Sequence, residues 1–239
     1  MATPLAPAPR RIALVTGSAG GIGRAIAMAL QEAGMDVIGV DRIPHEDGVL
    51  DRTEIVDLSD PAECDALIAR VGRVDVLVNN ASVLVVKPLE DLALPDFDVL
   101  FSVNLRAPVL LTRAVLPDMA KRGWGRIINL SSIGARTGGV SQSAVYNMTK
   151  AGIASFTKFV ARHYGSHGIT SNAVAPGGIV TGMTAHMTDD EFQTLVAQIP
   201  VGRMATPDEV ASAVAYLASD AAGFINGVTL DVNGGWVMV

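Results

Sequence analysis

The pattern of apolar residues alternates between short continuous runs and longer segments with helical spacing. The runs at 12–16 and 125–130 are largely apolar, which is typical of strands buried on both faces of a parallel sheet. Segments such as 22–33 and 143–166 instead repeat their apolar residues at helical spacing. The alternation predicts an α/β fold, a doubly wound parallel sheet (Rossmann-like) covered by helices on both faces.

In chain order, strands are expected at 12–16, 36–40, 54–57, 74–78, 125–130, 169–175 and 228–231. Helices are expected at 22–33, 61–70, 96–120 and 143–166, and within 189–199 and 207–218. The stretch 42–53 is short and carries Pro44 and Gly48, so we expect a loop with at most one helical turn there. Since no repeat or composition break divides the chain, we expect a single domain at 11–239 after a disordered lead-in at 1–10.

The clearest chemical signal is the glycine-rich turn after the first strand. Thr16-Gly17-Ser18-Ala19-Gly20-Gly21-Ile22-Gly23 joins that strand to the helix at 22–33. Gly17 permits a tight exit from the strand, and the missing side chains at Gly21 and Gly23 let a pyrophosphate approach backbone N–H groups. The positive end of the helix dipole also favours that anion. The turn therefore predicts a dinucleotide site.

Asp41 ends the second strand and indicates which dinucleotide is bound. A carboxylate at this place can accept hydrogen bonds from both ribose hydroxyls of NAD and repels the 2′-phosphate of NADP. Ala19 and Gly20 offer no side chain for that phosphate. Arg42 is the opposing observation, because its guanidinium could reach a phosphate, stack on the adenine or lie in solvent. NAD is the expected cofactor.

Tyr146 and Lys150 are one helical turn apart and therefore share a helix face. A nearby positive charge favours the phenolate and lowers the pKa of a tyrosine hydroxyl, which is ordinarily near 10. The pair is suited to moving a proton on and off an alcohol, although such spacing also occurs on solvated helix faces. Two serines, Ser131 and Ser132, lie a short way upstream.

Taken together, these motifs resemble the short-chain dehydrogenase/reductase family from Arg11 to the C-terminus. The family's glycine motif corresponds to Thr16–Gly23, its acidic adenine contact to Asp57-Leu58, and its Asn-Asn-Ala-Gly motif to Asn79-Asn80-Ala81-Ser82. Pro176-Gly177, Ile179 and Thr181 match the segment that holds the nicotinamide carboxamide. The resemblance implies cofactor contacts from Gly17, Gly21, Ile22, Gly23, Asp41, Arg42, Asp57, Leu58, Asn79, Ala81, Tyr146, Lys150, Pro176, Gly177, Ile179 and Thr181.

The resemblance also implies the catalytic residues Asn104, Ser132, Tyr146 and Lys150. Tyr146 would act as general base or acid in a hydride transfer, Ser132 would hold the substrate oxygen, and Asn104 would hold a water that links Lys150 to solvent. Two departures stand out. Ser82 replaces the family's usual glycine, and Tyr146 lies one residue further from Ser132 than is commonest, which leaves Ser131 as an alternative.

The substrate is less clearly indicated. Gln142, Met183 and His186 are candidate substrate contacts. The C-terminal region resembles 3-oxoacyl-carrier-protein reductases, whereas Asp41 favours NAD-dependent sugar or polyol dehydrogenases. We expect a small secondary alcohol such as a sugar or polyol, with 3-oxoacyl-thioester reduction, cyclic dihydrodiol oxidation, or a dinucleotide-binding sensor or scaffold as alternatives.

Composition narrows the setting of this chemistry. A net charge of −6 without a basic tract argues against nucleic acid, and no apolar run looks long enough to span a membrane. Cys64 is the only cysteine, so an internal disulfide is impossible and a cytoplasmic location is expected. The proposed chemistry needs no metal. The long helices and the apolar tail at 233–239 indicate a homotetramer.

Overall fold

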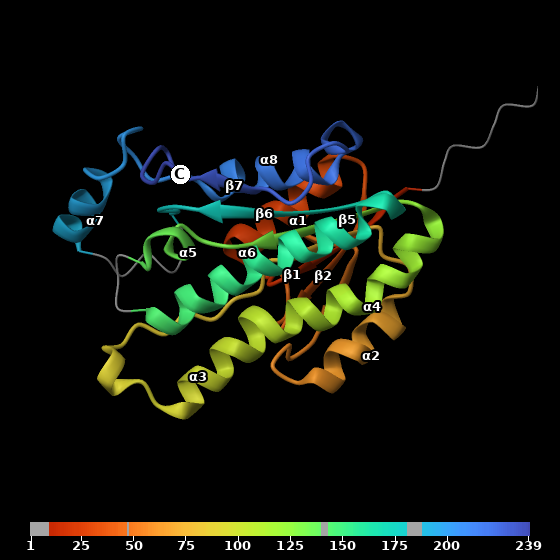
Figure 1. Cartoon of the computed structure of the whole chain (residues 1–239), viewed down its shortest axis with the longest axis horizontal. Helices are drawn as coiled ribbons and strands as arrows, with labels where there is room; N and C mark the ends of the chain where they lie inside the picture. Colours follow the sequence, from red (N-terminus) through yellow and green to blue (C-terminus); the bar gives the residue numbers. More distant parts are fainter. Residues whose placement is uncertain (1–9, 47, 140–142, 181–187) are drawn as a thin grey trace, which may run out of the picture.

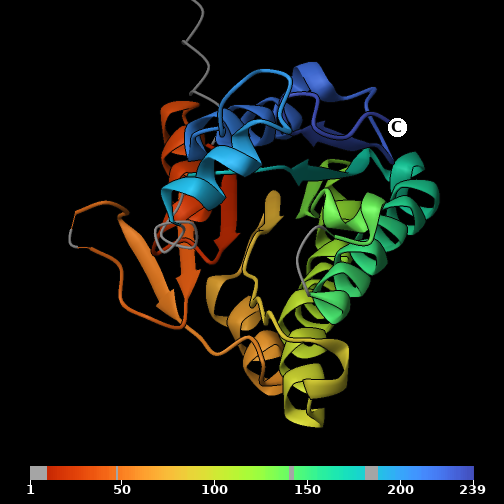
Figure 2. The ribbon, with the colours of Figure 1, turned by 90° about the vertical axis from the view of Figure 1, so that its left-hand side faces the viewer.

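The computed structural model describes residues 10–46, 48–139, 143–180 and 188–239 (Figures 1 and 2). In this part of the chain, seven strands form one sheet in the order β3-β2-β1-β4-β5-β6-β7. Every neighbouring pair is parallel. The expected doubly wound α/β fold is confirmed.

The strands are β1 Ile12–Thr16, β2 Asp36–Asp41, β3 Arg52–Ile55, β4 Val76–Asn79, β5 Gly125–Leu130, β6 Ile169–Pro176 and β7 Thr229–Val232. The α-helices are α1 Gly21–Glu32, α2 Pro61–Val71, α3 Leu94–Phe101, α4 Ala107–Arg122, α5 Gly134–Thr137, α6 Ala144–Tyr164, α7 Asp189–Val196 and α8 Pro207–Ala218. These bounds agree with the expected elements to within about two residues, except that the short α5 was not expected. Between β2 and β3 the described residues contain no helix, as expected for that loop.

Helices cover both faces of the sheet (Figure 1). On one face α1 and α8 lie side by side, and buried residues such as Ile26, Leu30 and Val214 form a core with β1, β4 and β6. On the other face α2, α4 and α6 contribute a second core, which includes Leu67 and Leu111. Because helices bury both faces of the sheet, the polar groups that can meet solvent or a ligand lie at the ends of the strands.

A π-helical turn, Ser102–Arg106, joins α3 to α4 in one continuous helix. Pro108 has no N–H to donate to the carbonyl of Asn104, four residues earlier, so a regular α-helical bond is impossible there. The wider turn accommodates this gap, and π turns inside helices are frequent at functional sites. The buried side chain of Asn104 lies at the centre of the turn.

The helical segment Leu94–Arg122, with 29 residues, is long and apolar enough to cross a membrane by length and composition alone. This corrects the expectation that no apolar run reaches that length. Its buried residues, including Leu111, Val115 and Met119, pack against the sheet in the second core. Packing of this kind is that of a core helix in an α/β protein.

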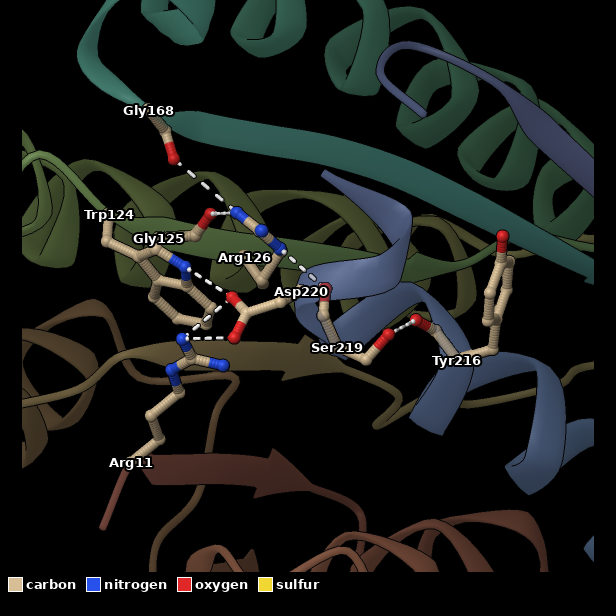
Figure 3. Close-up of polar contacts among 8 residues, drawn as sticks. All are labelled: Arg11, Trp124, Gly125, Arg126, Gly168, Tyr216, Ser219 and Asp220. Atoms are coloured by element: carbon tan, nitrogen blue, oxygen red, sulfur yellow. Dashed lines mark hydrogen bonds and ion pairs between the residues drawn. The ribbon is translucent and has the colours of Figure 1, made fainter. Parts of the chain in front are cut away.

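At the amino ends of the strands, Trp124 lies between two guanidinium groups (Figure 3). Arg11 is 3.8 Å and Arg126 4.4 Å from the centre of its ring. Asp220 accepts two hydrogen bonds from Arg11, at 2.7 and 2.9 Å, and one from Trp124 Nε1 at 3.1 Å. Arg126 is buried and donates to the carbonyls of Gly125, Gly168 and Ser219. The cluster ties the starts of β1, β5 and β6 to the end of α8.

We expect the ring of Trp124 to contribute more to the stability of this cluster than the ion pair between Arg11 and Asp220 does. Asp220 is 69% exposed, so Asp220→Asn should lower the free energy of unfolding by less than about 1 kcal/mol. Trp124→Ala removes the ring between two like charges and should cost about 2–3 kcal/mol. Urea unfolding of both variants measures the difference, and equal losses would contradict this assignment.

Candidate active site

A cleft of about 730 Å³ runs along the carboxyl ends of the central strands. Its lining includes most of the residues expected to form the site: Gly17, Gly21, Ile22, Gly23, Asp41, Arg42, Asp57, Leu58, Ala81, Ser132, Tyr146, Lys150, Pro176, Gly177 and Ile179. Segments far apart in the sequence therefore converge on one cavity, as the parallel topology requires. Gln142, Thr181, Met183 and His186 lie outside the described residues.

The glycine turn forms one end of the cleft and is closely packed. A Cβ at Gly23 would overlap the carbonyl oxygen of Gly17, and one at Gly17, whose φ is +68°, would lie 2.8 Å from Ala81 Cα. The first turn of α1 has no acidic residue, and its Gly20 N-cap supplies no side-chain hydrogen bond. Its backbone N–H groups are thus available to an anion, and a pyrophosphate fits this place.

Asp41 lies at the end of β2 with its carboxylate fixed by backbone donors. Oδ2 accepts from the N–H of Ala19 at 3.0 Å, and Oδ1 accepts from the N–H of Arg42 at 2.8 Å. Arg42 is exposed, and its charge contributes to lowering the pKa of Asp57, after the larger effect of hydrogen bonds from Ser59. The two carboxylates and the arginine therefore surround the far end of the cleft, where an adenosine would lie.

The two asparagines of the Asn79-Asn80 pair have different places. Asn80 lines the cleft and donates from Nδ2 to the carbonyls of Thr16 and Gly17, at 2.9 and 3.1 Å. Asn79, expected to contact the cofactor, has its side chain in the core, where it donates to Asn129 Oδ1 at 2.8 Å. Asn79 is the last residue of β4 and Asn80 the first after it, and the structure turns only the side chain of Asn80 to the glycine turn.

Tyr146 and Lys150 lie on α6 at the other end of the cleft. Lys150 is fully buried, its Nζ donates to the carbonyl of Leu130 at 2.8 Å, and it lies 5.5 Å from the centre of the Tyr146 ring. Burial lowers the pKa of the Lys150 ammonium to about 8. Burial raises the pKa of Tyr146, against the opposing effect of hydrogen bonds with Ser132 and Ser82.

The sequence led us to expect a lowered tyrosine pKa, and the direction found is the reverse. Desolvation of the phenolate outweighs the other influences on Tyr146. Lys150 is directed to a backbone carbonyl instead of the phenol oxygen. A phenolate at Tyr146 therefore depends on the hydroxyl donors around it and on charges brought by a ligand.

The two serines after β5 have separate contacts. Ser132 lines the cleft with Tyr146 and opposes the rise in the pKa of its phenol, and the Ser132 Oγ accepts from the N–H of Gly134 at 3.1 Å. Ser131 is buried and donates to the carbonyl of Lys150 at 3.0 Å. The structure thus places Ser132 beside the phenol and Ser131 behind the helix that carries it.

Asn104 lies behind the cleft wall, with its amide bound entirely to protein groups. Its Oδ1 accepts from the N–H of Val83 at 2.8 Å and from Ser82 Oγ at 3.2 Å. Its Nδ2 donates to the carbonyl of Val83 at 2.9 Å and to Thr149 Oγ1 at 3.3 Å. The side chain joins the loop after β4 to α6, the helix that carries Tyr146 and Lys150.

The segment after β6 closes the cleft from the side of β7. Gly177 donates its N–H to the carbonyl of Val232 at 3.0 Å, and a Cβ on it would lie 2.8 Å from that of Asn233. The C-terminal residues fold back over this segment, and Trp236 lines the cleft. Among the described residues, no group of three or more His, Cys, Asp or Glu could hold a metal ion.

Comparison with known proteins identifies the family that uses this arrangement. The profile of the family described as enoyl-(acyl carrier protein) reductase matches residues 17–237. The chain belongs to the short-chain dehydrogenase/reductase family. It is an oxidoreductase that acts on a CH–OH group with a nicotinamide dinucleotide.

The relatives of this short-chain dehydrogenase/reductase include a carrier-protein reductase and a nodulation protein. The 3-oxoacyl-[acyl-carrier-protein] reductase FabG of Escherichia coli is 40% identical over 240 residues, which cover 96% of this chain and 98% of the relative. Nodulation protein G of Azospirillum brasilense is 38% identical over 242 residues, which cover 95% and 98%.

Solved structures add sugar-acid enzymes to these relatives. A protein of Beutenbergia cavernae assigned as an NAD(P)-dependent gluconate 5-dehydrogenase, with NADP bound at low occupancy, matches with a TM-score of 0.90 and 35% identity over 97% of each chain. One of Agrobacterium tumefaciens assigned as a 2-deoxy-D-gluconate 3-dehydrogenase, with NADP bound, matches with a TM-score of 0.89 and 32% identity, covering 95% of this chain and 96% of the other.

Sequence reasoning missed several residues that line the cleft. Asn80 was part of a recognised motif, but only the strand's register shows that it, and not Asn79, faces the cavity. Trp236 was assigned to a subunit contact because the C-terminal tail is apolar, and nothing local to it indicates that the tail folds back. Ser82 was noticed as a departure from the family, without a role.

The buried ammonium of Lys150 should lower the free energy of unfolding of the protein. Its pKa falls from 10.5 to about 8, so the ammonium still predominates at neutral pH but is less stable in the folded state than in the unfolded state. Lys150→Met should raise the free energy of unfolding of the free protein at pH 7 by about 1–3 kcal/mol. As the pH rises above about 8, wild type loses this penalty and the difference should shrink.

Urea unfolding at several pH values measures this effect, and Lys158→Met is the matched control on an exposed position of α6. The control should change stability by no more than about 0.5 kcal/mol at any pH. A loss of stability in Lys150→Met at neutral pH would contradict the argument from desolvation.

Proposed function

We propose that the protein is an NAD-dependent dehydrogenase that interconverts a small secondary alcohol and its ketone, with Tyr146 as general base or acid. The observation that carries this proposal is the pairing of two features in one cleft. The hydroxyls of Ser132 and Tyr146, with Lys150 behind them, lie at one end, and the glycine turn and Asp41 lie at the other.

The bound nicotinamide would supply the hydride acceptor or donor. The chain's own residues would hold the substrate and move its proton. In the oxidative direction, Ser132 would bind the alcohol oxygen and Tyr146 would take its proton, a contribution of roughly 10²–10⁴ in rate for a well-placed general base. Lys150, with a pKa of about 8, would exchange that proton onward at working pH, and Asn104 would hold the wall of the cleft against α6.

The substrate class we propose is a sugar, polyol or other small hydroxy compound. The similarity to structures assigned as gluconate dehydrogenases supports it. A second candidate is reduction of a 3-oxoacyl thioester, which the 40% identity to such reductases favours. Apolar side chains line the cleft, among them Ile133, Leu195, Met204 and Trp236, and they would suit the carbon skeleton of either substrate.

The preference for NAD is proposed from Asp41. Backbone N–H groups of Ala19 and Arg42 already orient this carboxylate. Little further conformational entropy is therefore lost when it accepts hydrogen bonds from the ribose hydroxyls. A 2′-phosphate at the same place would meet this negative charge. The charge of Arg42 helps to lower the pKa of Asp57, after the larger effect of hydrogen bonds from Ser59.

Asp41→Asn tests this preference, because it keeps the shape of the side chain but removes its charge. We expect the ratio of kcat/KM for NAD to that for NADP to fall about 10- to 100-fold, from a weaker ribose contact and lost repulsion. Steady-state kinetics with both cofactors measure the ratio. Asp36→Asn, at the exposed amino end of the same strand, is the control, and a wild-type preference for NADP would contradict the proposal.

Tyr146→Phe tests the catalytic role with a panel of sugars, polyols, cyclic diols and 3-hydroxyacyl thioesters. Removal of the phenol oxygen should lower kcat at least 100-fold while the dissociation constant for NADH changes less than about threefold. Nicotinamide absorbance follows turnover, and fluorescence follows binding. Retained turnover would sink the catalytic assignment, whereas a chain with cofactor binding but no turnover of any panel member would favour the sensor or scaffold.

We also propose a homotetramer in the cytoplasm. Exposed apolar side chains occur on α6, at Met148 and Phe159, and on the C-terminal tail, at Met238 and Val239. Apolar surface of this kind is commonly covered by another subunit. Light scattering in solution measures the mass, and a monomer at micromolar concentration would contradict this part of the proposal.

A further inference from the structure

Asn147 joins the end of α5 to the start of α6. Tyr146 lines the cleft, whereas the side chain of Asn147, the next residue, is buried and directed to α5 and the residues that follow it. Its Nδ2 donates to the carbonyl of Gly138, just after α5, at 2.6 Å and to Ser143 Oγ, just before α6, at 3.4 Å. One amide group therefore holds both segments.

Two glycines make room for this amide. A Cβ at Gly134 would overlap Asn147 Oδ1, and a Cβ at Gly139 would overlap Asn147 Nδ2. The φ of Gly139, +95°, favours glycine for its own reason. Gly134, by contrast, begins α5 without a positive φ, so other residues could adopt its backbone conformation. The lack of a Cβ at Gly134 therefore matters for the contact with Asn147.

Gly134 also contacts Ser132, which lines the cleft. The N–H of Gly134 donates to Ser132 Oγ at 3.1 Å. Because this bond uses a lone pair of the serine oxygen, the hydroxyl proton points away from Gly134 and can be donated to a substrate oxygen. A displacement of Gly134 would move the Ser132 hydroxyl or release it to rotate.

We propose that Asn147 is a positioning residue that fixes Gly134 and, through its N–H, the hydroxyl of Ser132. Since Asn147 and Tyr146 are neighbours in α6, a contact that fixes α5 against Asn147 also fixes Ser132 relative to Tyr146. The close fit of the amide to Gly134 thus sets the distance between the two hydroxyls that act on the substrate. This inference rests on the proposed roles of Ser132 and Tyr146.

The fit is tested by crowding it and then relieving it. Gly134→Ala places a methyl group where Asn147 Oδ1 lies, and the resulting shift of α5 should lower kcat for the best substrate of the panel about 100-fold. Asn147→Ala removes the bonds to Gly138 and Ser143 and should lower kcat about tenfold. In the double variant the methyl group occupies the vacated space, so kcat should return to about that of Asn147→Ala.

Lys158→Met, on an exposed position of α6, is the control, because it vacates no space beside Gly134 and should not rescue Gly134→Ala. The dissociation constant for NADH should change less than about threefold in every variant, since only the substrate's hydrogen-bond donor is displaced. A Gly134→Ala chain that folds only together with Asn147→Ala shows the same rescue. Losses that multiply in the double variant overturn the proposal, and so does wild-type kcat in Gly134→Ala.

Hydrogen exchange at the amide of residue 134 follows its bond to Ser132 without a substrate. Exchange should be about tenfold faster in Asn147→Ala than in wild type, and Ser132→Ala, which removes the acceptor, sets the scale. After correction for the intrinsic rates of glycine and alanine, protection should return in the double variant. If it returns while wild type turns over no panel member, the proposed function fails and the contact stands. Unchanged exchange in Asn147→Ala contradicts the inference, whatever the turnover.

Discussion

The parallel pairing of the seven described strands is the constraint on which the rest of this structure depends. It requires a crossover between successive strands, buries both faces of the sheet under helices, and leaves the strand ends as the places where polar groups meet solvent. The amino ends and the carboxyl ends of the strands carry different groups. The amino ends carry the cluster around Trp124, and the carboxyl ends carry the cleft that contains Asp41, Ser132 and Tyr146.

A chain of buried amides and hydroxyls fixes α6, the helix that carries Tyr146 and Lys150. Asn79 donates to Asn129 at 2.8 Å, and Asn129 donates to Thr157 of α6 at 2.9 Å. Two turns towards the cleft, Asn104 donates to Thr149 of the same helix at 3.3 Å. Polar bonds are directional, whereas apolar packing tolerates sliding, so these contacts set the position of α6 along the sheet. The place of Tyr146 against Ser132 and Ser82 follows from them.

Much of the fold could be predicted because its signals are local. Apolar runs mark the buried strands, and the glycine turn marks the passage from β1 to α1. The absence of a helix between β2 and β3 in the described residues follows from the short, Pro- and Gly-containing connection. By contrast, the place of Trp236 in the cleft depends on contacts between distant segments.

The chemistry of the site was less predictable than its residues. The spacing of Tyr146 and Lys150 indicated that they share a helix face, but the effect on the pKa of each group depends on burial, which spacing does not contain. In the same way, the Asn79-Asn80 pair indicated a place near the cofactor, but only the structure shows that the Asn79 side chain lies in the core and that of Asn80 at the glycine turn. The hydrogen bond from Ser82 to Asn104 could be found only from the structure.

A crystal structure of the protein with NADH bound would test the central claim most directly, namely that one cleft joins the glycine turn to the proton-transfer pair. The account predicts the pyrophosphate at the N-terminus of α1, the adenosine ribose on the carboxylate of Asp41, and the nicotinamide beside Tyr146 and Lys150. A dinucleotide bound elsewhere, or with its nicotinamide directed away from Tyr146, would contradict it.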